Sequence, residues 1–136
     1  MMRYKQRGLT LMELLIVMVV VGILAGIAWP SYRAQVVRTN RAEAKVALEQ
    51  ARQGLERCFT RFNAYDAGGC EMAFPVDTPS GTYRVTAALA AATFTLTATP
   101  QGAQAADDPQ CANFTLTDRG VRGISGTGDA QQCWGR

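Results

Sequence analysis

The hydrophobic residues of this chain follow three successive patterns: an unbroken apolar run, a helical stripe and an alternation of period two. The apolar run comes first, because no residue from 14 to 32 is charged and the acid Glu13 stands immediately before it. As a helix, these 19 residues would span about 28 Å, close to the roughly 30 Å hydrocarbon core of a bilayer. The run therefore predicts a membrane-spanning helix.

The helical stripe occupies the next segment, from Ser31 to about Phe62. Apolar side chains recur there at steps of three and four residues, at Ala44, Leu48, Ala51, Leu55, Cys58 and Phe62. This spacing places them on one face of a helix. We therefore expect one long helix with an anchor half, residues 9–30, and an amphipathic half, residues 31–62, that packs on a domain.

Alternation of apolar and polar residues characterises the remaining domain, residues 63–136. It predicts three strands and, after a turn at Gly120, a short fourth one: 82–89, 93–99, 113–117 and 121–123. Residues 63–80 are rich in Gly, Asp and Pro and predict a loop, as do the Gly/Ser/Thr-rich residues 123–136. The fold class predicted is α+β, with the long N-terminal helix packed on a three- or four-stranded antiparallel sheet.

Three helix-weakening residues fall at four-residue intervals in the anchor half: Gly22, Gly26 and Pro30. A glycine costs a helix about 1 kcal/mol relative to alanine, and an interior proline costs about 3 kcal/mol. Gly22 and Gly26 also match the small-residue spacing that lets membrane helices pack closely. The segment can therefore serve as a packing face, partly unwind, or simply be an ordinary membrane helix.

Four cysteines, Cys58, Cys70, Cys111 and Cys133, occur in a chain without histidine. No two of them have the C-x-x-C spacing of a zinc or redox motif. An even number of cysteines behind a membrane-targeting segment indicates disulfides in an oxidising compartment, with free buried thiols as the alternative. Of the three pairings that four cysteines allow, Cys58–Cys70 with Cys111–Cys133 is favoured because both bridges are local.

The formal charge of +3 comes entirely from a basic N-terminal tail, residues 1–8, that holds Arg3, Lys5 and Arg7. The rest of the chain has 11 basic and 11 acidic residues, so its net charge does not support general polyanion binding. The amphipathic half is nevertheless basic. Its charges can be solvated, can complement acidic heads of neighbouring copies, or can contact phosphate of lipid or DNA through Arg33, Arg38, Arg41 and Lys45.

Catalytic chemistry finds few candidate residues in this sequence. Without histidine an ordinary Ser-His-Asp triad is excluded. Asp107 and Asp108, next to Pro109, are interpreted as a solvated turn, with calcium ligation as the alternative. The sequence Gly126-Thr127-Gly128 lacks the features of a nucleotide-binding loop and is interpreted as a plain loop. We therefore expect no enzyme, no metal and no cofactor.

Glu13 is the most informative charged residue, because a carboxylate in a membrane helix is costly and requires a partner. Cleavage between Gly8 and Leu9 would create a positive amine four residues away, and the amine of another copy could meet Glu13 directly. The alternative is a tolerated acid at the membrane interface. Basic residues flank the run on both sides, so the oxidising environment that the cysteines need decides the orientation.

These residues resemble a known family. The segment from Arg7 to Glu13 with the following apolar run is similar to the class III signal of type IV pilins and type II secretion pseudopilins, over residues 5–32. Leu9 replaces the commoner Phe. The resemblance implies cleavage after Gly8 by prepilin peptidase, N-methylation of Leu9, and pairing of Glu13 with a neighbour's amine as subunits enter a helical filament.

Further segments resemble the PilE-type minor pilins: Ser31-Tyr32, residues 38–44, and the C-terminal TLTDRGVRGISGTG with CW. The terminal pattern is shared with DNA-uptake pilins, and the Cys111–Cys133 loop resembles the pilin D-region. The resemblance implies a pilus subunit for assembly and twitching motility, anchored in the inner membrane with a periplasmic head before it joins the extracellular filament. Its partners would be other pilins, the peptidase and the assembly machinery. The alternatives are a DNA-binding pilin and a secretion pseudopilin.

Overall fold

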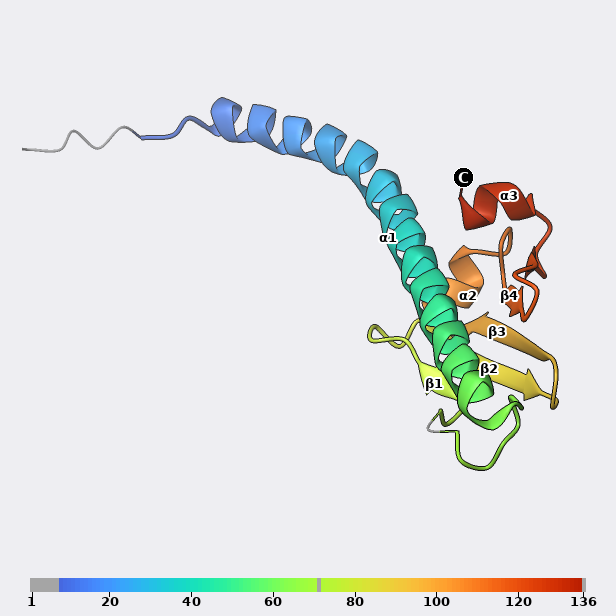
Figure 1. The fold of residues 1–136 in the computed structure, drawn as a ribbon. Coiled ribbons are helices and arrows are strands. Elements are labelled where there is room, and N and C mark those ends of the chain that lie inside the picture. The colour runs from blue at the N-terminus through green and yellow to red at the C-terminus, as the bar shows by residue number, and fades with distance from the viewer. Residues whose placement is uncertain (1–7, 71, 136) are drawn as a thin grey trace, which may run out of the picture. The chain divides into compact units, whose positions relative to one another are not determined.

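The computed structural model describes residues 8–70 and 72–135, and it confirms the α+β class (Figure 1). A long helix comes first, and a sheet with two short helices follows. The elements in chain order are α1 (Leu11–Phe62), β1 (Val76–Asp77), β2 (Tyr83–Leu89), β3 (Phe94–Pro100), α2 (Ala103–Asp107), β4 (Phe114–Thr117), β5 (Arg122–Ile124) and α3 (Ala130–Trp134).

The chain divides into two compact units, residues 1–36 and residues 37–136. The division falls a few residues beyond the boundary predicted at residue 30. The first unit contains the apolar part of α1, and of the predicted leader, residues 1–8, only Gly8 lies within the described residues. The second unit contains the rest of α1 together with the sheet, α2 and α3.

Both ends of α1 have a recognisable local cause. At the start, Thr10 acts as the N-cap: its Oγ1 accepts from the Glu13 amide at 3.2 Å, and its carbonyl accepts from the Leu14 amide at 3.2 Å. At the end, Asn63 adopts a φ of 55°, and its amide donates to Phe59 O at 2.7 Å. A left-handed Asn after the last turn is a common helix stop, and it places the end of α1 at Phe62 as predicted.

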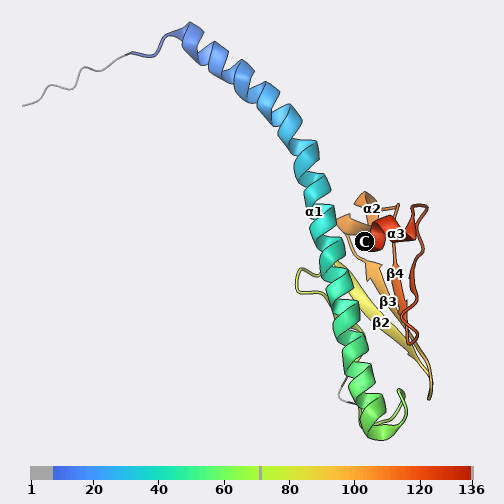
Figure 2. The same ribbon diagram turned by 45° about the horizontal axis from the view of Figure 1, so that its top comes forward.

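The sheet is a five-stranded antiparallel meander in the order β1-β2-β3-β4-β5 (Figure 2). The prediction of three or four strands was wrong by one strand, because Val76 and Asp77 pair with Val85 and Arg84 inside the predicted loop 63–80. Two residues are too few to show an alternation, so the sequence pattern cannot reveal β1. The other four strands lie within about one residue of their predicted positions.

The core lies between the second-unit part of α1 and one face of the sheet, as Figures 1 and 2 both show. Five of the six stripe residues of α1 are buried: Ala44, Leu48, Ala51, Leu55 and Cys58. Phe62, the sixth, is 41% exposed, so its assignment to the stripe was wrong. Phe59 packs against the core instead, because its ring stacks on Tyr65 with centroids 4.6 Å apart.

The C-terminal segment is more ordered than the predicted loop 123–136. It contains β5 and α3, and Asp129 caps α3 by accepting from the amides of Gln131 at 2.6 Å and Gln132 at 3.1 Å. Between these elements the chain runs against the backbone before β4: the Gly126 amide donates to Cys111 O at 3.2 Å. A Cβ at Gly126 would overlap Gln110 O, so glycine is required there by close backbone approach.

This close approach makes Gly126→Ala a specific test of the C-terminal packing. The added methyl group meets main-chain atoms that cannot rotate away, so we expect a loss of about 1–3 kcal/mol in the free energy of unfolding. Gly68→Ala is the matched control, because nothing lies within 4 Å of its Cβ position. Urea denaturation followed by circular dichroism measures both, and equal midpoints would contradict the packing argument.

Candidate functional site

The first-unit part of α1 is apolar on every side. The four consecutive residues Leu14, Leu15, Ile16 and Val17 cover all faces of a helix, and each is 54–56% exposed. By length and composition α1 is sufficient to cross a membrane. A helix that is hydrophobic all round requires an apolar environment on all sides, either lipid or other helices.

The candidate processing site precedes this helix. Gly8 and Leu9 are exposed and lie outside regular structure, immediately before the Thr10 cap. Glu13 is exposed at the third position of α1, and its carboxylate has no ion pair within the described residues. Thr10-x-x-Glu13 is also a capping-box spacing, a signal that the sequence analysis missed. Glu13 can therefore support the helix start locally as well as meet a neighbouring amine.

Gly22, Gly26 and Pro30 all lie inside the helical span of α1. No heavy atom lies within 4 Å of a Cβ built on Gly22 or Gly26, so both glycines leave open notches on the helix surface. Such notches suit close approach of another helix. The expected weakening of the helix at these three residues stays a prediction.

The structure contains the two disulfides that spacing favoured. Cys58 bonds to Cys70 with Cα atoms 5.4 Å apart, and Cys111 bonds to Cys133 with Cα atoms 5.7 Å apart. The first attaches the loop after α1 to the last turns of that helix. The second closes a loop that contains β4, β5 and the start of α3.

Asp108 is buried and ion-paired, so its interpretation as part of a solvated turn was wrong. Its side chain is 0% exposed and receives two hydrogen bonds of 2.7 Å from the Arg41 guanidinium, one to each carboxylate oxygen. The Cys111 amide donates to Oδ1 at 3.2 Å, and Gln104 Nε2 donates to Oδ2 at 3.3 Å. A buried carboxylate with four donors is fully satisfied, which its burial requires.

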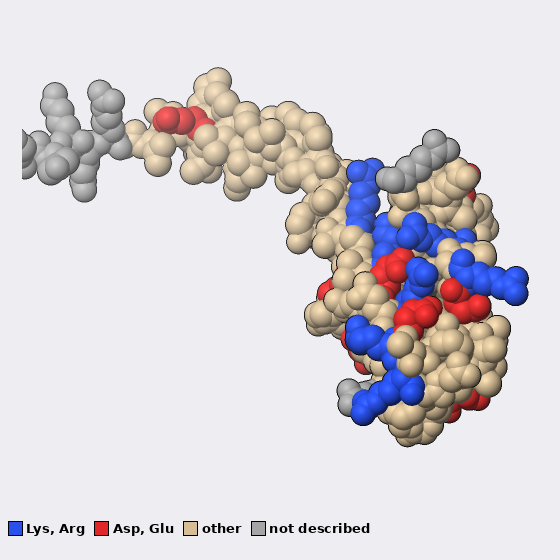
Figure 3. Space-filling view, in the orientation of Figure 1, with Lys and Arg blue, Asp and Glu red and all other residues tan. Residues whose placement is uncertain are grey.

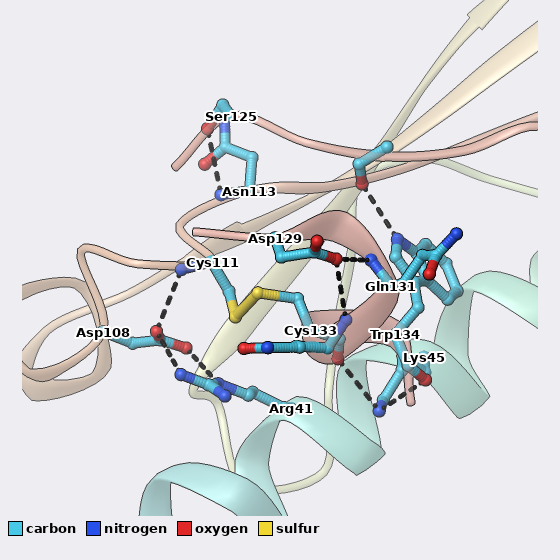
Figure 4. Close-up of a disulfide and its surroundings, with 12 residues drawn as sticks. Arg41, Lys45, Asp108, Cys111, Asn113, Ser125, Asp129, Gln131, Cys133 and Trp134 are labelled. Carbon is cyan, nitrogen blue, oxygen red and sulfur yellow. Dashed lines mark hydrogen bonds and ion pairs between the residues drawn. A yellow bond between two sulfur atoms is a disulfide. The ribbon is translucent and has the colours of Figure 1, made fainter. Parts of the chain in front are cut away.

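Lys45 lies one helical turn beyond Arg41 and binds the other end of the disulfide-closed loop. Its Nζ donates to Cys133 O at 3.2 Å and to Trp134 O at 3.0 Å (Figure 4). Burial lowers the pKa of Lys45, whereas the hydrogen bond with Asp108 raises the pKa of Arg41. We call Arg41, Lys45 and Asp108 the loop clamp, because the two cations hold both ends of the Cys111–Cys133 loop against α1.

The loop clamp corrects part of the predicted phosphate site. Arg41 and Lys45 direct their donors into their own domain, so they are not available as surface contacts. Arg33 belongs to the first unit, whereas Arg38 is exposed on the second. Within the second unit, Arg38 is therefore the exposed member of the predicted set. Figure 3 shows Lys and Arg side chains of the second unit interspersed with acids.

A hydrogen-bond chain extends the loop clamp into the core. Gln104 Nε2 donates to the Tyr83 hydroxyl at 3.1 Å, and Gln104 Oε1 accepts from Asn40 Nδ2 at 2.9 Å. Tyr83 is fully buried, and this burial raises its pKa to about 12. The chain connects α1, α2 and β2 through side chains without a buried unpaired atom among the described residues.

Candidate catalytic and metal residues do not gather at one place in the part of the chain that the structure describes. Within it, no three His, Cys, Asp or Glu side chains are placed to share a metal ion. The Ser80 hydroxyl bonds the Glu43 carboxylate, and Ser125 Oγ accepts from the Asn113 amide at 3.1 Å. Both hydroxyls thus take part in local hydrogen bonds.

An apolar N-terminal helix that continues into an amphipathic helix packed on an antiparallel meander, with a disulfide-closed C-terminal loop, defines the class of type IV pilins. Two family models match the chain. The prokaryotic N-terminal methylation motif matches residues 3–29, and the type IV minor pilin ComP, DNA uptake sequence receptor, matches residues 30–115. The second match covers more than half of the sequence, and the chain therefore belongs to the ComP family of type IV minor pilins.

Individual relatives are also fimbrial proteins. The type IV major fimbrial protein FimA of Dichelobacter nodosus is 36% identical over 69 residues, which are 51% of this chain and 43% of FimA. The type IV major pilin protein PilA of Myxococcus xanthus is 34% identical over 85 residues, 62% of this chain and 39% of PilA. The matched regions thus span less than half of each relative's length.

A solved type IV pilin from Shewanella oneidensis is 28% identical to this chain. The alignment covers 63% of this chain and 89% of that structure, with a TM-score of 0.45. The assignment to the family depends on the two family models and not on this superposition.

The loop clamp predicts a large effect of Arg41→Met on stability. This change leaves the Asp108 carboxylate buried without its cation, which costs about 3–5 kcal/mol in the free energy of unfolding. Adding Asp108→Asn removes the unpaired charge, so the double variant should recover part of that loss. Arg38→Met is the control on the exposed surface. Urea denaturation that found Arg41→Met as stable as Arg38→Met would contradict the clamp.

Proposed function

We propose that this protein is a structural subunit, a minor pilin, of a type IV pilus that serves pilus assembly and twitching motility. The observation that carries the proposal is the all-round apolar helix inside the segment that matches the methylation motif, residues 3–29. Such a helix is stable in lipid before assembly and among like helices afterwards, and both environments remove its side chains from water.

Processing would occur between Gly8 and Leu9. Both residues are exposed and precede the cap of α1, so a prepilin peptidase could reach this bond without unwinding the helix. Cleavage removes the basic tail and leaves the amine of Leu9, which the same enzyme class would methylate. The anchor itself stays attached to the domain.

Glu13 would then select the geometry of assembly. In the filament its carboxylate pairs with the Leu9 amine of a neighbouring copy, because an unpaired acid in an apolar environment is costly. Hydrophobic contact alone does not set the axial offset between two neighbouring helices. The ion pair sets it, because Glu13 of one helix must lie beside the N-terminal amine of the next. Gly22, Gly26 and Pro30 would let the helix bend or unwind locally as it packs.

The domain would face the periplasm before export. Its two disulfides need an oxidising compartment, and type IV pilin membership implies a membrane-anchored subunit that enters a pilus. The partners would be other pilin subunits, the prepilin peptidase and the inner-membrane assembly machinery.

Glu13→Gln is the sharpest test of this function. Glutamine keeps the size of the side chain and is also an accepted residue at this capping-box position, but it removes the charge. If Glu13 pairs with a neighbour's amine, the variant should be processed and retained in the membrane, yet its amount in sheared pili should fall about tenfold. A loss of about 1.4 kcal/mol corresponds to that factor.

Thr10→Ala is the matched control, since it removes the cap and leaves the charge. Immunoblots of sheared filaments and membranes, normalised to the total protein, measure incorporation. Unchanged recovery of Glu13→Gln would refute the ion pair, and a loss in Thr10→Ala alone would assign Glu13 to helix capping.

A second candidate function is recognition of DNA. The matched ComP family is described as a DNA uptake sequence receptor, which motivates the proposal for this chain. Arg38, Arg57 and Arg61 are exposed along α1 and form no ion pair with any described residue. The chain after the leader has no net charge, so binding would depend on these exposed arginines and not on long-range attraction.

An electrophoretic mobility shift with the purified full chain tests this second function. Replacing Arg38, Arg57 and Arg61 together by Gln should weaken binding and reduce the slope of log K against log salt by about 3, near one for each phosphate that is no longer neutralised. Arg84→Gln is the control, because Arg84 is already paired with Asp77 at 2.7 Å. Absence of salt-sensitive binding by the unaltered protein would exclude the DNA function.

A further inference from the structure

The Cys58–Cys70 disulfide borders a solvent-open hollow of about 200 Å³ at the end of α1. Both half-cystines line this hollow, together with Arg57, Arg61 and Phe62. Cys58 is 7% exposed, whereas Cys70 is only partly buried, so Cys70 is the more accessible residue of the bridge. The bridge is therefore accessible as well as structural.

The other disulfide differs in this respect. Cys111 is 0% exposed and Cys133 is 4% exposed, and both belong to the main core cluster. Lys45 of the loop clamp also binds the carbonyl of Cys133 and so holds this end of the bridge against α1 (Figure 4). A reagent can reach it only after the C-terminal loop has detached from α1.

Two arginines give the hollow a positive charge. Arg57 and Arg61 are one helical turn apart, and the Arg61 guanidinium lies 5.4 Å from the centre of the Phe62 ring. Neither arginine forms an ion pair with any described residue. The acid Glu71 follows Cys70 in sequence and lies outside the described residues. Cations beside a disulfide attract an anionic thiol and stabilise the thiolates that exchange requires.

We propose that the Cys58–Cys70 bridge is a thiol–disulfide exchange site for small anionic thiols of the glutathione class. The thiolate of the incoming thiol attacks Cys70 Sγ, the sulfur–sulfur bond breaks, and its electron pair leaves with Cys58 as a thiolate. A second thiolate then attacks the mixed disulfide and releases the oxidised thiol dimer. Two thiols are oxidised to one disulfide, and Cys58 and Cys70 take up the two protons as free thiols.

Arg57 and Arg61 have a specific part in the first step. Cys58 lies near the C-terminus of α1, where the helix dipole disfavours a negative charge. The two guanidinium groups beside the hollow offset this effect for the departing Cys58 thiolate. They also raise the local concentration of an anionic thiol relative to a cationic one.

Reduction at this site would leave the domain folded. Tyr65, in the same loop, donates its amide to Ala91 O at 3.0 Å and packs edge-on against Phe94 with centroids 4.8 Å apart. Met72, beyond Cys70, occupies the notch at Gly54 of α1. The chain on both sides of Cys70 is thus held independently of the disulfide, so exchange releases only the surface segment between them.

The test follows both disulfides in the full chain, in detergent micelles, during exposure to glutathione or to cysteamine. Alkylation and peptide mass spectrometry give the reduction rate of each bridge per thiolate present. We expect the Cys58–Cys70 bridge to react with glutathione at least about tenfold faster than Cys111–Cys133, through a mixed disulfide on Cys70. The variant Arg57→Gln with Arg61→Gln should lower the glutathione-to-cysteamine rate ratio about three- to tenfold.

Arg38→Gln with Arg119→Gln is the matched control, because it removes the same two charges outside the hollow. It should leave that ratio unchanged. Equal reduction rates of the two bridges would overturn the proposal. A ratio that is the same in both double variants, or a mixed disulfide found only on Cys58, would overturn it as well.

Discussion

The ion pair between the buried Asp108 carboxylate and Arg41 determines how the elements of the second unit fit together. The carboxylate has no access to water, so each of its oxygens must be matched by a donor. The donors come from Arg41 on α1, from Gln104 on α2 and from the backbone at Cys111. One anion therefore joins the helix, the turn between β3 and β4, and the beginning of the disulfide-closed loop.

This requirement also fixes the position of α1 along the sheet. Apolar side chains tolerate small shifts, whereas a bidentate pair with both bonds at 2.7 Å does not. With Arg41 held, Lys45 reaches the carbonyls of Cys133 and Trp134 one turn further along. The hydrophobic stripe supplies most of the stabilisation, and the loop clamp sets the axial position at which α1 packs on the sheet.

Much of this fold follows from the sequence because its main signals are periodic. Spacing of three and four residues predicted the buried face of α1, spacing of two predicted β2, β3 and β4, and the turn at Gly120 predicted β5. The elements that the sequence did not predict are too short to show a period: β1 has two residues, and α2 and α3 have five each. Asp108 escaped because its partner lies 67 residues away, and nothing local distinguishes a buried acid beside a proline from a solvated one.

The candidate sites also fall into those that the sequence could suggest and those that only the structure reveals. Gly8, Leu9 and Glu13 could be proposed from sequence, because they lie in a short linear segment that matches the N-terminal methylation motif. The role of Arg41 and Lys45 could not, since a basic helix looks the same whether its cations face water or an internal acid. Once those two are assigned to the domain, the arginines left at the surface are fewer and better defined. The DNA contact and the thiol exchange proposed above both use that smaller set, which includes Arg57 and Arg61 beside the accessible disulfide.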